Sequence, residues 1–264
     1  SQKLAAKYWP RTIVNDITNH NWEGEITGKG SKVQIRVIPN IAITDDAVNS
    51  TISYQNLSDD KVELPIDRAK TFAFQVSDID KAQSDINILN TATSAAAKDM
   101  AVDIDKTVLG SIYSGAGTSM ASTQVTSASV LNWIIDAAVI LDDNGVDDDG
   151  RWLALPPWII GMIKKSDLRQ AYLTGDDKSI LRSPNGLVGM IDRFKVYYSP
   201  NIFNNGTTWS CMAGHKESTT FASQIARVET VRLQDRFGDA VRGQNVFGFK
   251  VVTPSGLVYM PATK

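Results

Sequence analysis

The sequence is poor in the residues from which metal centres and disulfide frameworks are built. It has one cysteine, Cys211, and two histidines among 264 residues. A single cysteine excludes an internal disulfide and any metal site built from several cysteines, and it is compatible with folding in a reducing cytosol. His20 stands alone, so no histidine cluster is available to a metal. We therefore expect neither a metal nor another cofactor.

The sequence also has little net charge and no long apolar run. The formal net charge is -2, which excludes a strong basic field that would steer the protein to nucleic acid or to an anionic membrane. The basic residues form no dense patch with interleaved aromatic residues. The longest apolar run, residues 131–141, is too short to span a bilayer and contains Asn132 and Asp136. We expect no membrane association and no sequence-specific contact with DNA.

The dominant pattern that is present is one long helix, from Asp78 to about Ile112. Ser77 and Asp80 form a capping box at its start, and Gly110 follows its last turns. At 1.5 Å per residue, this helix is roughly 50 Å long, so we expect it to lie along the protein as a spine. Its apolar stripe consists of Ile79, Ala82, Ile86, Leu89, Ala96, Met100, Ile104, Val108 and Ile112.

Before the spine, the apolar period changes to two. Residues 32–38 alternate as a half-buried strand does, and shorter alternating segments follow at 62–66 and 72–76. Between the strand at 32–38 and the segment at 62–66, residues 45–60 form a polar tip. A two-stranded excursion of this length is at best marginally stable alone, so it needs another surface, in its own domain or in a neighbour.

The first 23 residues mix basic and aromatic side chains, and Pro10 breaks any helix. We interpret residues 1–23 as an arm that docks on another surface. The alternative is a ragged terminus.

After the spine, helices and strands alternate. We expect an amphipathic helix at 127–141 and a helix from Pro157, at its first turn, to Gln170. Strands are expected at 151–155, 194–198, 209–213, 227–233, 245–253 and 257–260. The order at about 145–225 suggests an α/β unit. Residues 236–243 have the composition of a turn-rich link, and the last two strands are expected to pair as a hairpin across residues 254–256.

Three local patterns resemble functional motifs without completing them. The acidic turn at 142–150 lacks the ligand frame of a calcium loop and is better explained as a solvated turn. Gly115-Ala116-Gly117 ends a helix and has no third glycine, so it is not a nucleotide-binding fingerprint. Cys211 and His215 are close enough in sequence for a nucleophile pair, but a strand position favours a buried, inert cysteine. We predict no catalytic, cofactor-binding or metal-binding residue.

The order of parts resembles the major capsid protein of tailed bacteriophages, which has the Hong Kong 97-like fold. Residues 70–83, KTFAFQVSDIDKAQ, resemble the junction of that family's extended loop and spine helix. Residues 150–156, GRWLALP, resemble the beginning of its axial domain. Residues 236–243, RFGDAVRG, followed by VFGFKVV at 246–252, resemble its C-terminal end and are the most specific of these stretches. The resemblance extends over about residues 1–264.

This resemblance implies an α+β fold with four parts: an N-terminal arm (1–23), an extended β-hairpin loop (24–77), a peripheral domain with the spine helix (78–144 and 226–264) and an axial domain (145–225). It implies a non-enzymatic protein whose hexamers and pentamers close an icosahedral shell around double-stranded DNA in the cytoplasm of a bacterial host. Scaffolding, portal and decoration proteins are the further partners that it suggests.

The arm and the loop carry the candidate contacts between subunits. These are Tyr8, Trp9, Trp22, Arg36, Ile52, Tyr54, Glu63 and Arg68. Some relatives cross-link a loop lysine to an asparagine of a neighbour. Lys32 and Lys61 are candidates for that role by position only.

Two alternative functions remain at this point. A bacterial nanocompartment shell protein, similar to encapsulin, shares the fold but encloses proteins, and a cargo peptide that docks on the interior would identify it. A cysteine-dependent hydrolase would use Cys211 and His215, and thiol alkylation without loss of function would remove it.

Overall fold

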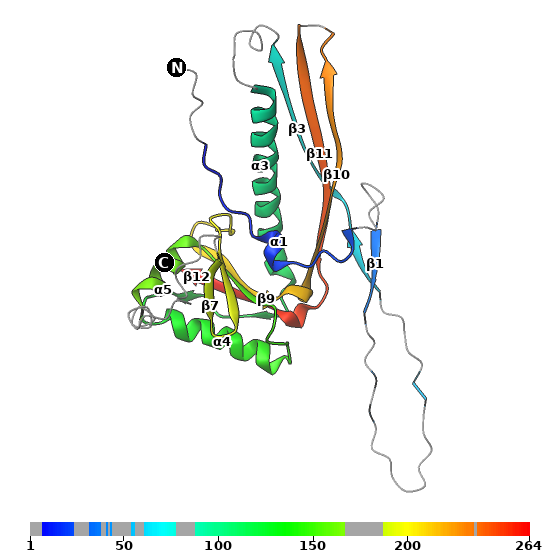
Figure 1. The fold of residues 1–264 in the computed structure, drawn as a ribbon. Helices are drawn as coiled ribbons and strands as arrows, with labels where there is room; N and C mark the ends of the chain where they lie inside the picture. Colours follow the sequence, from blue (N-terminus) through cyan, green and yellow to red (C-terminus); the bar gives the residue numbers. More distant parts are fainter. Residues whose placement is uncertain are drawn as a thin grey trace.

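The computed structural model describes residues 7–23, 32–37, 41, 43, 54–55, 61–77, 88–166, 187–234 and 237–264. These residues form an α+β structure with sheets of two, three and seven strands. A long helix and the three-stranded sheet extend together away from the seven-stranded sheet, and the small sheet lies to one side (Figure 1).

The two-stranded sheet is the base of the expected hairpin. Strand β1 (Lys32–Arg36) pairs antiparallel with β2 (Lys61–Pro65), with Val33 opposite Leu64. Both of these side chains are buried, together with Ile35, so the predicted alternation is confirmed in the described residues. Most of the polar tip at 45–60 lies outside the described residues.

The three-stranded sheet joins segments that are far apart in the sequence. Its strands are β10 (Thr219–Arg232), β11 (Gly238–Val251) and β3 (Arg68–Ser77), in that order and all antiparallel. The expected turn-rich link at 236–243 is therefore wrong for residues 238–243, which form the start of β11. Gly243 lies opposite Phe72, and a Cβ atom at Gly243 would collide with the Phe72 ring. The glycine that suggested a turn instead allows a close approach within a strand.

The spine is helix α3 (Ile88–Leu109), with 22 residues. The capping box of Ser77 and Asp80 and the first part of the predicted helix fall largely at 78–87, outside the described residues. The helix ends at Leu109, directly before Gly110 and about three residues earlier than predicted. Ile112 is not in it, because the chain tightens there into a 3₁₀ turn, η2 (Ile112–Gly115).

The seven-stranded sheet has β6 (Arg151–Leu155) near its centre, and every residue of β6 is buried. Its other strands are β4 (Thr118–Ser119), β5 (Thr123–Gln124), β7 (Leu187–Ile191), β8 (Phe194–Tyr198), β9 (Thr208–His215) and β12 (Leu257–Thr263). The order is β4-β12-β9-β6-β8-β7, and β5 also pairs with β12. Helices α4 (Val130–Asp143) and α5 (Pro157–Lys165) pack against it.

The expected hairpin between 245–253 and 257–260 is wrong. A 3₁₀ turn, η4 (Pro254–Gly256), carries the chain from the three-stranded sheet to the seven-stranded one, where β12 pairs with β9. The boundaries of the four parts stay a prediction. However, β12 and the strands at 145–225 share one sheet, so the C-terminal residues link the two larger sheets.

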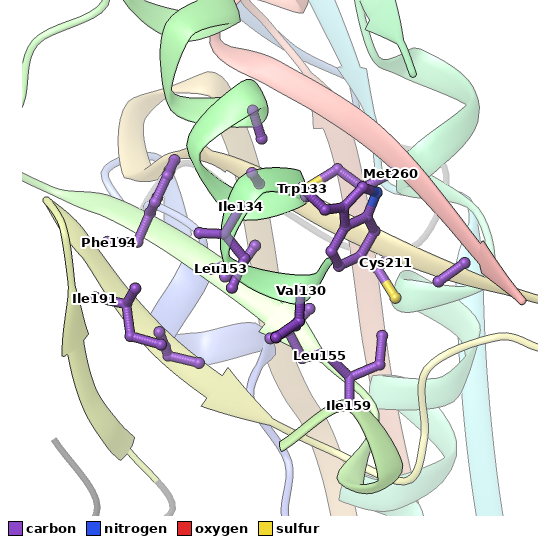
Figure 2. Packing of buried hydrophobic residues seen from close by; sticks show 14 of the residues in the cluster. Val130, Trp133, Ile134, Leu153, Leu155, Ile159, Ile191, Phe194, Cys211 and Met260 are labelled. Atoms are coloured by element: carbon purple, nitrogen blue, oxygen red, sulfur yellow. The ribbon is translucent and has the colours of Figure 1, made fainter. Parts of the chain in front are cut away.

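The seven-stranded sheet separates two apolar layers. On one face, Val130, Ile134 and Leu141 of α4 pack in one cluster with Leu153 and Leu155 of β6 (Figure 2). On the other face, Trp152 and Ala154 pack with the end of α3 and with the short helix α1 (Val14–Ile17). A last 3₁₀ turn, η3 (Lys216–Ser218), connects β9 and β10. Within the described segments, no helix combines the length and apolarity needed to cross a membrane.

Candidate assembly surfaces

The N-terminal segment is fastened to its own subunit by a buried carboxylate. Asp105 on α3 is 1% exposed. One of its oxygens accepts the backbone N–H groups of Ile13, at 2.8 Å, and Val14, at 3.0 Å. The N-cap residue of α1, Ile13, has no side-chain acceptor for the first N–H groups of the helix. Asp105 therefore supplies from another helix the cap that the local sequence lacks.

The second oxygen of Asp105 accepts the side-chain amide of Asn201, at 2.8 Å. Burial raises the pKa of Asp105, and the hydrogen bonds from Asn201, Ile13 and Val14 oppose that rise. The carboxylate thus connects the N-terminal segment, the spine helix and the residues after β8.

The rest of the described N-terminal segment continues along the same subunit. The backbone N–H of Asn19 donates to Thr219 O, and the Asn19 carbonyl accepts from Phe221 N–H. Asn19 therefore forms a parallel bridge beside the start of β10. Trp22 packs against the cluster between β1, β2 and the three-stranded sheet. At the other end, Trp9 Nε1 donates to Asp99 at 2.9 Å. Residues 9–22 therefore contact the rest of their own subunit, and the assignment of residues 1–23 as an N-terminal arm stays a prediction.

Large apolar side chains are uncovered at two places in the described residues. Ile43 and Tyr54, on the excursion beyond β1 and β2, are 95% and 94% exposed, and Ile41 is exposed as well. Tyr8 is exposed beside the docked Trp9. Isolated apolar residues are common on surfaces, but large apolar side chains that are exposed this fully are candidates for contact with another surface. Sequence reasoning missed Ile41 and Ile43, although their alternation within a polar region was a usable signal.

The predicted contact residues fall into three groups. Trp9, Trp22, Glu63 and Arg68 have partners within the subunit. Glu63 accepts Lys32 Nζ at 2.7 Å, and this hydrogen bond lowers the pKa of Glu63, whereas the Arg68 guanidinium lies 4.6 Å from the centroid of the Phe249 ring. Tyr8 and Tyr54 are almost fully exposed, and Arg36 is exposed while also taking part in an interaction. Ile52 lies outside the described residues. Their role between subunits stays a prediction.

A groove of about 310 Å³ lies between the N-terminal segment, α3 and the three-stranded sheet. The helix contributes Thr93, Ala97 and Ala101, one turn apart from each other, and the sheet contributes Phe72 and Val228. Ala97 and Ala101 have small side chains, and the space that they line is not filled by other side chains of the described residues. One side of the spine is therefore only partly packed by its own subunit.

The cysteine and histidine pair is not assembled. Cys211 is fully buried in the cluster beneath α4, beside Trp133 and Met260 (Figure 2). Burial raises the pKa of its thiol, which disfavours the nucleophilic thiolate. The His215 ring is held elsewhere, because Nε2 donates to Asp149 O at 2.6 Å and Nδ1 accepts from Glu217 N–H at 3.2 Å.

The acidic turn is organised by arginines. Arg151 is 1% exposed, and its Nη1 donates to Asp142 Oδ1 at 2.6 Å. Arg193 bridges Asp142 and Asp148 from outside, and its hydrogen bond, followed by that of Arg151, lowers the pKa of Asp142. These carboxylates neutralise the arginines that tie α4 to β6 and β8. Asp142 and Asp148 are therefore paired with arginines. Among the described residues, no group of acidic, histidine or cysteine side chains is arranged to hold a metal ion.

Comparisons with known proteins agree on one family. A family model described as phage capsid protein matches residues 62–260. A structure from Mycobacterium phage Che8 superimposes with a TM-score of 0.80 and 27% identity, covering 98% of this chain and 94% of that chain. The capsid structure of cyanophage P-SCSP1u gives a TM-score of 0.78 at 13% identity, with coverages of 99% and 91%. The capsid of Ralstonia phage GP4 gives 0.66 at 12% identity, with coverages of 100% and 94%. A search of curated protein sequences returns no match.

Proposed function

Because this chain belongs to the phage capsid protein family, we propose that its copies form the hexamers and pentamers of an icosahedral shell around double-stranded DNA. The chain is a major capsid protein of a tailed bacteriophage, with the Hong Kong 97-like fold, and a structural component of the virion. The symmetry of the shell, its contents and its assembly in the host cytoplasm belong to the proposal.

The observation that carries the proposal is the exposure of apolar side chains on the extended excursion. Ile43 and Tyr54 gain nothing from their own subunit in the described residues. In a closed symmetric assembly, a weak contact is repeated at every position, so a short extended segment across a neighbour suffices to stabilise the whole. We propose that Tyr8 and the predicted loop contacts, including Ile52, Arg36 and Tyr54, meet neighbouring subunits.

The shell wall is proposed to contain DNA without reading its sequence and without catalysis. The net charge of -2 supports weak contact with a polyanion. The buried Cys211 and the engaged His215 argue against the cysteine hydrolase. The nanocompartment alternative has no support in the family match. Scaffolding, portal and decoration proteins remain the further partners of the proposal.

The test substitutes the exposed apolar residues by an acid. Ile43→Asp and Tyr54→Asp are expected to leave the circular dichroism and the melting temperature of the unassembled subunit unchanged and to lower the yield of sedimenting particles. Ser122→Asp, in an exposed loop of the seven-stranded sheet region, is the matched control and is expected to assemble normally. Full particle yield from both loop variants would contradict the proposed role of the loop.

A further inference from the structure

Helix α4 has an apolar outer face as well as an apolar inner one. Ile135 and Val139 are 49% and 50% exposed. They are four residues apart, which places them one above the other on the same side of the helix. The opposite side is buried in the core. Two adjacent aliphatic side chains that are half exposed on a rigid helix form a contact surface in a way that scattered ones do not.

The charge of this outer face is entirely acidic. Asp136, beside Ile135, is exposed and makes no ion pair with any described residue. The helix contains no lysine or arginine in its sequence VLNWIIDAAVILDD. If two copies met by pairing their α4 faces about a two-fold axis, like charges would approach with no cation on either helix to compensate. The surface therefore fits a partner that is apolar and basic.

A surface of that kind exists elsewhere on the same chain, on β7 and β8. Met190 is 52% exposed and lies opposite Lys195 in the register of the two strands. Their neighbours Ile191 and Phe194 point into the cluster under α4. Since successive residues of a strand point to opposite faces, Met190 and Lys195 lie on the face away from α4. Lys195 is exposed and has no ion pair among the described residues.

We propose that α4 of one copy packs on β7 and β8 of the next copy in a ring, with Ile135 and Val139 against Met190 and with Asp136 paired to Lys195. The inference rests on the proposed function and specifies its partner as a second copy of this chain. The two surfaces are different and lie on opposite faces of one sheet. Contacts between different surfaces are heterologous, and their repetition closes a ring when the rotation permits it. A ring of this kind is a capsomer.

Engineered cysteines test the geometry directly. Particles of a Val139→Cys/Met190→Cys double variant are expected to give, on oxidation, a ladder of covalent oligomers that ends at closed rings. Particles mixed from the two single variants are expected to stop at dimers of one copy of each. Cys211 is fully buried and adds no background. Homodimers from either single variant would indicate an isologous contact and would overturn the proposal.

Charge exchange tests the polar pair independently. Asp136→Lys and Lys195→Asp are each expected to reduce particle yield about tenfold, since a repulsion of about 1.4 kcal/mol per contact has that effect on an equilibrium constant. The combination of both substitutions is expected to restore the yield. Asp149→Lys and Lys164→Asp, which change exposed charges outside α4, β7 and β8, are the matched controls. Undiminished yield from both single variants, or no recovery in the combination, would contradict the contact.

The outcomes separate this contact from the function on which it rests. Particles that form normally but give no covalent ladder would overturn the contact and leave the coat function intact. A natural chain that forms no particle in any condition would overturn the proposed function and the ring contact together. A ladder ending at rings supports both.

Discussion

The buried carboxylate of Asp105 on the spine helix accepts a 2.8 Å hydrogen bond from the side-chain amide of Asn201, 96 residues further along the chain. Its other oxygen holds the start of α1 through Ile13 and Val14. One side chain thus joins the N-terminal segment, the spine helix and the residues after β8. The stability of the subunit should be more sensitive to Asp105 than to any exposed acid of the same helix.

We predict that Asp105→Ala lowers the free energy of unfolding by about 3 kcal/mol, because it leaves the buried N–H groups of Ile13 and Val14 without their acceptor and leaves the Asn201 amide only its longer hydrogen bond to Arg11 O. Asp105→Asn keeps the shape and one acceptor oxygen and should cost less. The control is Asp103→Ala, which removes only an exposed pair with Lys70 and should cost under about 1 kcal/mol. Urea unfolding of the unassembled subunit measures all three. Equal effects at 103 and 105 would contradict the role of Asp105.

The stability difference between the natural chain and Asp105→Asn should depend on pH. Burial raises the pKa of Asp105 above its ordinary value of 3.8, so between these two values the native state binds more protons than the unfolded state. The contribution of this group is then fully present below the ordinary pKa and is lost as pH rises through the native one. The natural chain should therefore gain on the variant as pH falls through this window. A difference that stays constant with pH would show that Asp105 does not titrate in this way.

The sequence predicted those elements whose pattern is local. The alternation at 32–38 and the apolar face of α4 decide which side is buried, and both are confirmed for the described residues. The resemblance to capsid proteins rested on residues 70–83, 150–156 and 236–252, and the family model covers all of them. The fold class could therefore be predicted from the order of the expected helices and strands together with these family-like sequence stretches.

The features that the sequence did not predict depend on non-local contacts. Gly238 and Gly243 have the composition of a turn, but they lie where β3 approaches β11 closely. Asp105 follows Ile104 at the edge of the apolar stripe, and nothing in its spacing distinguishes it from the exposed Asp103. Only the folded chain brings Ile13 and Asn201 to it. The pairing of β12 with β9 likewise depends on the assembled seven-stranded sheet, and the turn at Pro254–Gly256 before β12 does not predict it.

Two of the three glycines of β11, Gly243 and Gly248, give a prediction about packing. A Cβ atom at Gly248 would collide with the backbone oxygen of Pro65, whereas one at Gly243 would collide with the ring of Phe72. A side chain can rotate away, but a backbone carbonyl in a paired strand cannot. We expect Gly248→Ala to cost more than Gly243→Ala, with overpacking costs of about 1–3 kcal/mol. Thermal unfolding measures the loss of stability in both variants. A larger loss in Gly243→Ala would show that the backbone at Pro65 shifts more easily than the Phe72 ring rotates.

Cys211 should behave as a structural residue. Its thiol is buried and its pKa is raised, so a thiol reagent should modify the native chain far more slowly than the chain in urea. Cys211→Ala should assemble with normal yield and lose only a modest amount of stability from the small cavity. Rapid modification of the native thiol, together with loss of a turnover activity, would revive the hydrolase alternative.

The most direct test of the coat function is electron microscopy of the assembled protein at a resolution that separates subunits. The account predicts closed shells built from rings of six and five copies, with the excursion that carries Ile43 and Tyr54 lying across a neighbouring copy. A chain that stays monomeric at every concentration and with every coexpressed structural partner, with these side chains still exposed to solvent, would contradict it.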